Sequence, residues 1–218
     1  MTASADKDKS DKPRRPGRPR GKKPGTANRE QLIDIALALF ARDGIARVSL
    51  NAIAREAGVT PAMLHYYFNS REALVEELLE ARFMPLCDRI GAVFLQHADN
   101  PVSAFTGMAQ VLADMAGKHP WFAPLWMHEM IGEVPVLRQQ MNARFGEESY
   151  RQMLDRIAGW QAAGKLNPGL TPELVFPTLI SLVLMPFSRA RSDARIQGIS
   201  AERIVSHALA MMNQGIRG

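Results

Sequence analysis

The chain has 218 residues, a net charge of +5, ordinary apolar content and a single cysteine. This length allows one large domain or two small ones, and a lone cysteine excludes an internal disulfide framework. The most apolar run, residues 174–187, is too short for a bilayer span of about 20 residues, and no secretory signal is apparent. We therefore expect a cytoplasmic protein with no membrane segment.

Residues 1–25 are polar, charged and rich in proline and glycine, a composition that does not fold alone. They hold nine Lys or Arg against three Asp, a net charge of +6, so the basicity of the chain is concentrated at one end. Within this arm, Gly17-Arg18-Pro19 resembles the AT-hook motif, which enters the minor groove of A·T-rich DNA. We expect minor-groove or phosphate contacts from Arg14, Arg15, Arg18, Arg20, Lys22 and Lys23. The alternative is a tail that only solubilises or localises the protein.

The first helix is expected over residues 28–43. Asn28 and Gln31 form a capping pair at its start, and Gly44 follows its last residue. Its apolar stripe comprises Leu32, Ile35, Ala36, Leu39 and Phe40. This stripe should pack behind the two helices that come next.

Residues 49–68 predict two short helices joined by a tight turn. Ser49 precedes a run with apolar or small residues at helical spacing, and Gly58 supplies the stop. Thr60 then caps a second helix whose first position is Pro61, where no N–H is needed. This order is typical of a helix-turn-helix unit, whose second helix usually enters the DNA major groove.

The remaining chain predicts further helices and no strands. Ser70 caps a helix that Pro85 should kink or break. Further helices are expected over residues 101–118, 120–131, 134–163, 171–189 and 200–213. The 171–189 helix is apolar nearly all round, so it should be buried on more than one side. The fold class is therefore all-α.

Residues 28–79 resemble the DNA-binding domain of the TetR family of bacterial transcriptional regulators. The resemblance rests on the order of Ile53-Ala54, Ala57-Gly58-Val59, Leu64 to Phe68, and Ser70 to Leu74. It implies an N-terminal three-helix DNA-binding domain followed by a helical ligand-binding and dimerisation domain, about nine helices in all. On this basis residues 1–25 are the arm, 26–72 the helix-turn-helix domain and 73–218 the effector and dimerisation domain.

The second helix of the unit should place Leu64 and Phe68 inward, because they are spaced i, i+4. Its opposite side should meet DNA through Pro61, Ala62, His65 and Tyr66. Met63 either touches a thymine methyl or fills the gap beneath the helix. Phosphate contacts are expected from residues at helix starts: Ser49, Thr60 and Arg71. His65 and Arg71 depart from the tyrosine and lysine common in the family, so their contacts are less defined.

The resemblance also implies a ligand pocket and a dimer contact in the C-terminal part. Soft apolar side chains that could line the pocket are Phe105, Met108, Met115, Trp126, Met127, Met130, Met153 and Trp160. His128 and Glu129 could add polar anchors. In TetR-like proteins the last two helices pair two copies, here through Leu174, Val175, Leu179, Leu182, Val183, Ile204 and Leu209.

The expected function is a sequence-specific transcriptional regulator, a repressor released from its operator by a small apolar or amphipathic ligand. Its partners would be double-stranded DNA with an inverted-repeat operator, the effector and a second copy, at the nucleoid in the cytoplasm. An activator would use the same reader, and an architectural DNA-binding protein would use the arm. No enzyme is expected, since the sequence has no nucleotide loop, metal-ligand spacing or nucleophile elbow; no catalytic residue, metal or cofactor is predicted.

Overall fold

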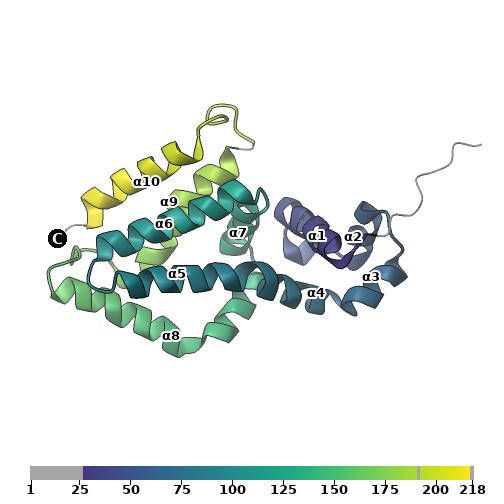
Figure 1. Ribbon diagram of the computed structural model, residues 1–218, viewed down its shortest axis with the longest axis horizontal. Helices are drawn as coiled ribbons and strands as arrows, with labels where there is room; N and C mark the ends of the chain where they lie inside the picture. Colours follow the sequence, from purple (N-terminus) through teal and green to yellow (C-terminus); the bar gives the residue numbers. More distant parts are fainter. Residues whose placement is uncertain (1–26, 191, 217–218) are drawn as a thin grey trace, which may run out of the picture.

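The computed structural model of the protein describes residues 27–190 and 192–216, and all regular elements within these residues are helical (Figure 1). The all-α prediction is thus confirmed. One end of the molecule holds the short N-terminal helices, and the other end holds the longer ones (Figure 1). The helices are α1 Arg29–Asp43, α2 Leu50–Ala57, α3 Pro61–Phe68, α4 Arg71–Leu78, α5 Met84–Gln96, α6 Pro101–Lys118, α7 Phe122–Ile131, α8 Val136–Ala162, α9 Pro172–Arg189 and α10 Ala201–Ile216.

Local sequence signals set the boundaries of the N-terminal helices. The side chain of Asn28 accepts a hydrogen bond from the backbone N–H of Gln31, whose side chain accepts one from Asn28 in return. This reciprocal box satisfies two N–H groups that the first turn of α1 cannot. Gly44 follows α1 with a φ of 81°, and the 3-10 turn Ile45–Arg47 leads to α2.

A single continuous rod carries the chain from the DNA-binding end into the helical domain. Between α4 and α5, residues Leu79–Phe83 form a π-helical turn, labelled η2, in which Met84 N–H donates to the Leu79 carbonyl. Because Pro85 has no N–H, the expected disturbance appears as this wider turn rather than as a break. Counting this rod once, the described residues form nine helices.

One apolar core runs through both ends of the molecule. α6 packs on α5, α9 and α10, while α7 lies between α1 and α9. The proposed boundary between residues 72 and 73 falls inside α4, whose Leu74, Val75 and Leu78 are buried in this core. The two ends of the rod are therefore joined by packed side chains rather than by a loose linker.

α8 differs from the uninterrupted helix expected over residues 134–163. At Gly146 the backbone turns to φ 67° and ψ 170°, a conformation outside the helical region, so the helix bends sharply there (Figure 1). Only glycine adopts this combination at low cost. The bend swings the first half of α8 toward α4, where Arg144 pairs with Glu76 and Glu80.

Candidate nucleic-acid interface and effector site

The turn between α2 and α3 is built from backbone geometry and two side-chain caps. Gly58 has a φ of 66° and its N–H donates to the Ala54 carbonyl, which closes α2. The hydroxyl of Thr60 accepts a hydrogen bond from Met63 N–H at 3.3 Å, and Pro61 opens α3. The two helices are thereby held at a fixed angle, as the sequence predicts for a helix-turn-helix unit.

The outward face of α3 gathers the side chains expected to meet DNA. Pro61, Ala62 and His65 are exposed, and Tyr66 is 82% exposed. On the opposite side Leu64 and Phe68 are buried against the core. Met63 is half-buried at the edge of the face. This arrangement presents a surface with few bidentate base readers, since it contains no Arg, Asn or Gln.

His65 has one ring nitrogen already engaged. Its Nδ1 lies 3.0 Å from the carbonyl oxygen of Asn69, which can only accept, so Nδ1 carries the proton. In the neutral ring Nε2 is then an acceptor. An exposed acceptor matches the amino group of adenine or cytosine in the major groove better than it matches a phosphate. The exposed Nε2 is therefore compatible with a base contact as well as with the phosphate contact expected from the sequence.

The three residues at helix starts differ in how far they remain available to phosphate. The hydroxyls of Ser49 and Thr60 accept backbone N–H bonds as caps, which leaves each hydroxyl hydrogen free to donate. Arg71 is half-buried, and its Nη2 donates to the Ile45 carbonyl at 2.6 Å. This bond fastens the start of α4 to the 3-10 turn, a structural role that sequence reasoning missed. The six basic arm residues lie outside the described part of the chain.

The three aromatic side chains expected to line a ligand pocket fall in two separate clusters. Phe105 and Trp160 pack with Phe94 and Phe176. Trp126 belongs to a second cluster with Phe83 and Phe122, beside the rod. Both clusters are packed core, so burial alone is no sign of a binding site.

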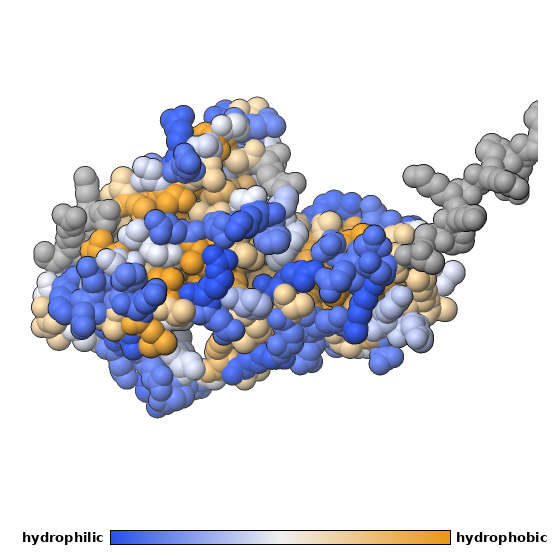
Figure 2. Space-filling view, viewed as in Figure 1, coloured by the Kyte–Doolittle hydropathy of each residue, from blue (hydrophilic) through white to orange (hydrophobic). Residues whose placement is uncertain are grey.

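The described residues form several hollows around these clusters. An open groove of about 770 Å³ runs between α6 and α10, where Figure 2 shows apolar surface. A cavity of about 620 Å³ lies between α1, the rod and the turn after α6, and Met115 lines it. A third, of about 370 Å³, lies between α6, α9 and α10 and is lined partly by Phe105. The other six expected pocket residues line none of these three.

The two polar residues of α7 are placed very differently. Glu129 is buried, and its Oε2 accepts hydrogen bonds from the backbone N–H groups of Leu137 and Arg138 at 2.9 and 3.1 Å. Burial outweighs these bonds and raises the pKa of its carboxyl. His128 is exposed and faces Gly44 at the end of α1. Glu129 thus holds the start of α8 instead of standing free in a pocket.

The expected dimer residues on α9 and α10 lie on more than one face. Leu179, Val183 and Ile204 are buried within the protomer, and Val175, Leu182 and Leu209 are half-buried. Leu174 is exposed. Met185 and Met211 are two further large side chains that are exposed on these helices. The sequence alone does not distinguish the residues of these helices that are buried within one protomer from those that are exposed to a second copy.

Two further features concern membrane spans and metal sites in the described residues. Among the helices described, none has the length and apolar character needed to cross a membrane. Within the same residues, no group of three or more His, Cys, Asp or Glu side chains is arranged to hold a metal ion.

Comparison with known proteins supplies independent information. The family described as bacterial regulatory proteins, tetR family, matches residues 32–78. The transcriptional regulator RutR of Escherichia coli K12 is 26% identical over 159 residues, covering 69% of this chain and 70% of RutR. The transcriptional repressor KstR2 of Rhodococcus jostii is 37% identical over 54 residues, covering 25% of this chain and 26% of the repressor. The solved structure of the ketosteroid transcriptional regulator KstR2 of Mycobacterium tuberculosis shares the fold, with a TM-score of 0.68 and 20% identity over 89% of this chain and 97% of that chain.

Proposed function

Because this chain belongs to the TetR family of bacterial transcriptional regulators, we propose that it is a repressor released from its operator by a small apolar or amphipathic molecule. The observation that carries the proposal is the outward face of α3. There Pro61, Ala62, His65 and Tyr66 stand exposed on a capped helix-turn-helix unit. Members of this family bind DNA operators, pair as dimers and bind small molecules.

DNA recognition is proposed to combine close approach by α3 with phosphate contacts around it. Pro61 and Ala62 are small and apolar, so they allow contact with thymine methyl groups. Tyr66 and the hydroxyls of Ser49 and Thr60 are proposed to bind phosphates, which fixes orientation without reading sequence. Two such units in a homodimer would read an inverted repeat whose half-sites lie about 34–36 Å apart.

The proposed site of action is DNA in the cytoplasm, at the nucleoid. Regulators of this family are normally not enzymes, and the proposal assigns no catalytic residue. Both modes of regulation use the same DNA reader, so repression rather than activation is proposed by analogy with KstR2 of Rhodococcus jostii, a transcriptional repressor.

Selection of bound sequences from a random DNA pool tests this function. The full chain should enrich an inverted repeat, and Pro61→Arg should change the enriched bases because it adds a bidentate donor to the reading face. Tyr66→Ala should weaken all sequences alike by about fivefold, since loss of one phosphate contact is worth about 1 kcal/mol. Tyr150→Ala, which removes an exposed tyrosine of α8, is the matched control.

The outcome decides between the proposals directly. No enriched sequence would reject a sequence-specific regulator. Enrichment that Pro61→Arg leaves untouched would show that α3 is not the reading helix. A reporter gene behind the enriched site separates the two modes, because a repressor lowers its expression and an activator raises it.

A further inference from the structure

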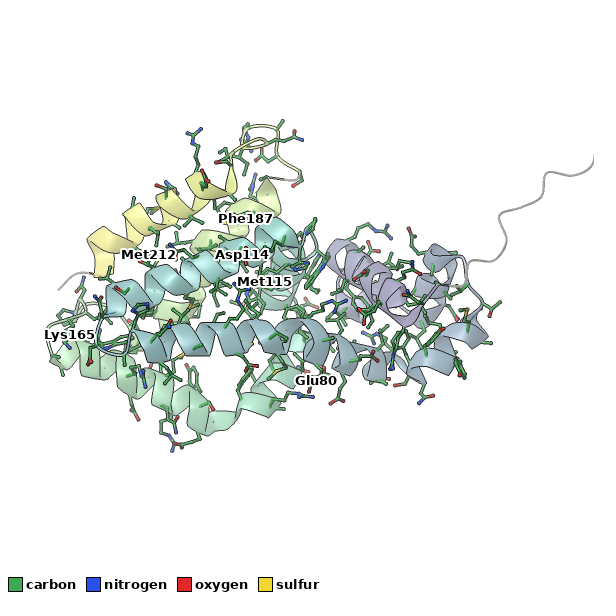
Figure 3. All side chains as sticks on the ribbon, in the orientation of Figure 1. Glu80, Asp114, Met115, Lys165, Phe187 and Met212 are labelled. Carbon is green, nitrogen blue, oxygen red and sulfur yellow. The ribbon has the colours of Figure 1, made fainter. Side chains whose placement is uncertain are left out.

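The cavity of about 620 Å³ lies where the DNA-reading unit meets the helical domain. Four parts of the chain surround it: α1, the rod at η2 and α5, the end of α6, and the turn into α7. In Figure 3 the labelled Met115 and its neighbour Asp114 lie on α6 above α5. The cavity is lined by Asp34, Ala81, Arg82, Pro85, Leu86, Arg89, Met115, His119 and Trp121. Its volume falls within the range of about 300–1,000 Å³ that is usual for small-molecule sites.

The lining divides into an apolar part and a charged part. Leu86, Met115 and Trp121 supply the apolar surface, and Trp121 is held in place by Phe83, whose ring centre lies 5.7 Å away. Against them stand two arginines, Arg82 and Arg89, with a single lining carboxylate from Asp34. This combination suits a molecule with a flat apolar body and a negatively charged end.

Both arginines have carboxylate partners, and those of Arg82 are the more exposed. Arg82 pairs with Glu30 at 2.7 Å and with Asp34 at 3.4 Å, and the side chains of both acids are about two-thirds exposed, at 66% and 65%. Arg89 pairs with Asp114 at 3.1 Å. Ion pairs with carboxylates as exposed as Glu30 and Asp34 contribute little, whereas Asp114 is 33% exposed and also pairs with Lys118. Water and salt screen the attraction between an arginine and a ligand carboxylate less when the ligand rests on apolar surface. Such a ligand can therefore displace the protein carboxylates from the arginines.

The backbone beside the cavity departs from an ordinary α-helix. Ala81 lines the cavity and lies four residues before Pro85, so its carbonyl lacks the N–H donor that an ordinary helix supplies. The π turn that accommodates this proline contains both Ala81 and Arg82. Such turns are frequent at functional sites.

We propose that this cavity binds an organic carboxylate with a flat apolar body, its charge held by Arg82 and Arg89 and its body resting on Trp121. Because Arg82 also pairs with Glu30 and Asp34 of α1, the ligand competes with two of the contacts between α1 and the rod. Occupancy of the cavity then changes the position of the DNA reader. This step rests on the proposed function as a repressor. A ligand acts only if it binds one of the two positions more tightly.

Isothermal titration of the full chain tests the binding step with defined probes. We would use 2-naphthoate, indole-3-acetate and decanoate at up to about 5 mM, with neutral 2-naphthalenemethanol for comparison. At least one of the two aromatic acids should bind saturably and more tightly than decanoate, and the neutral compound should bind at least about tenfold more weakly than that acid. No saturable binding by any of the three acids would overturn the proposal.

Variants locate the binding site. Arg89→Gln should weaken the acid about tenfold, and Ala81→Phe should abolish its binding by filling the cavity. Arg151→Gln, at an exposed arginine of α8 that pairs with Glu148, is the matched control and should bind as the parent does. Equal binding in Arg89→Gln and in the parent would reject the site, whatever the thermal stability of Ala81→Phe.

Operator binding tests the coupling step separately. A saturating acid should weaken binding of the selected DNA about fivefold or more in the parent but not in Arg89→Gln. Failure to bind any DNA while the acid still binds would reject the proposed function and leave the cavity assignment standing. DNA binding that no acid alters would reject the coupling.

Discussion

Glu129 ties α7 to the start of α8. The residue before α8 is Pro135, which has no side-chain oxygen to cap the helix, and no other side chain caps it from within. Glu129 reaches across from α7 and accepts the N–H groups of Leu137 and Arg138. From the sequence alone, this carboxylate is interpreted as a polar anchor for a ligand. Its capping contact depends on how α7 and α8 meet, which no local pattern reveals.

Substitution of Glu129 should separate its capping role from its charge. Glu129→Ala leaves two N–H groups without their acceptor and should lower the free energy of unfolding by about 2–3 kcal/mol. Glu129→Gln keeps an oxygen acceptor and should cost less than about 1 kcal/mol at pH 7. Urea unfolding of both variants at one protein concentration measures these differences.

The pH dependence of the same residue has a definite sign. Burial raises the pKa of the Glu129 carboxyl in the folded protein above that in the unfolded chain, so its ionisation opposes folding. The parent should therefore lose stability relative to Glu129→Gln as the pH rises from about 4.5 through the raised pKa. A difference between the two proteins that stays constant from pH 4.5 to 8 would contradict the assignment.

The bend of α8 connects the helical domain to the rod at a second place. Arg144 stands two residues before the bend and pairs with Glu76 of α4 and Glu80 of η2, and Figure 3 labels Glu80 at that side of the rod. These acids are exposed, so the pairs contribute little stability. The pairs instead place the first half of α8 beside the rod, because a straight α8 would carry Arg144 away from α4.

Gly146→Ala should destabilise the bend. At a φ of 67° with ψ near 170°, an L side chain is strained by about 1–3 kcal/mol, even though no atom lies within 4 Å of the added Cβ. Gly159→Ala in the same helix is the matched control. Its Cβ also meets nothing within 4 Å, but φ is not positive there, so alanine should stabilise by up to about 1 kcal/mol. Thermal unfolding measures both, and equal effects would contradict a required bend.

The predictable elements are those whose signals lie within a few residues. Asn28, Ser49, Thr60 and Ser70 each cap the helix that the sequence assigns to them. The bend at Gly146 was missed because glycine is tolerated inside a helix and the residues on both sides continue a helical pattern. The bond from Arg71 to Ile45 spans 26 residues, so no local pattern reveals it.

For the molecule as a whole, the sequence predicts which types of side chain line a pocket but not which residues do so. Soft apolar residues were expected around a ligand, but packing decides which of them face empty space. Phe105 and Met115 line separate cavities, whereas Trp126 stacks in the core. Arg82 and Arg89, which bring positive charge to the 620 Å³ cavity, are not among the pocket residues expected from the sequence.

Dimerisation should depend on the exposed face of α9 and α10. Met185 and Met211 are 47% and 55% exposed, which is unusual for large apolar side chains on helices proposed to pair two copies. The double variant Met185→Glu, Met211→Glu places four carboxylates in the proposed contact. It should raise the dimer dissociation constant about a hundredfold or more, as judged by sedimentation equilibrium. Leu95→Glu, on α5 with 71% exposure, is the control and should leave the dimer intact.

The basic arm should contribute affinity more than sequence preference. Residues 1–25 carry a net charge of +6, and each phosphate that a protein neutralises adds about −0.9 to the slope of log K against log salt concentration. Deleting residues 1–24 should therefore make the slope less steep by several units. The enriched operator should keep its half-sites, because these are read by α3, and lose only flanking A·T preference. Fluorescence anisotropy over a series of salt concentrations measures the slope, and an unchanged slope would remove the arm from DNA binding.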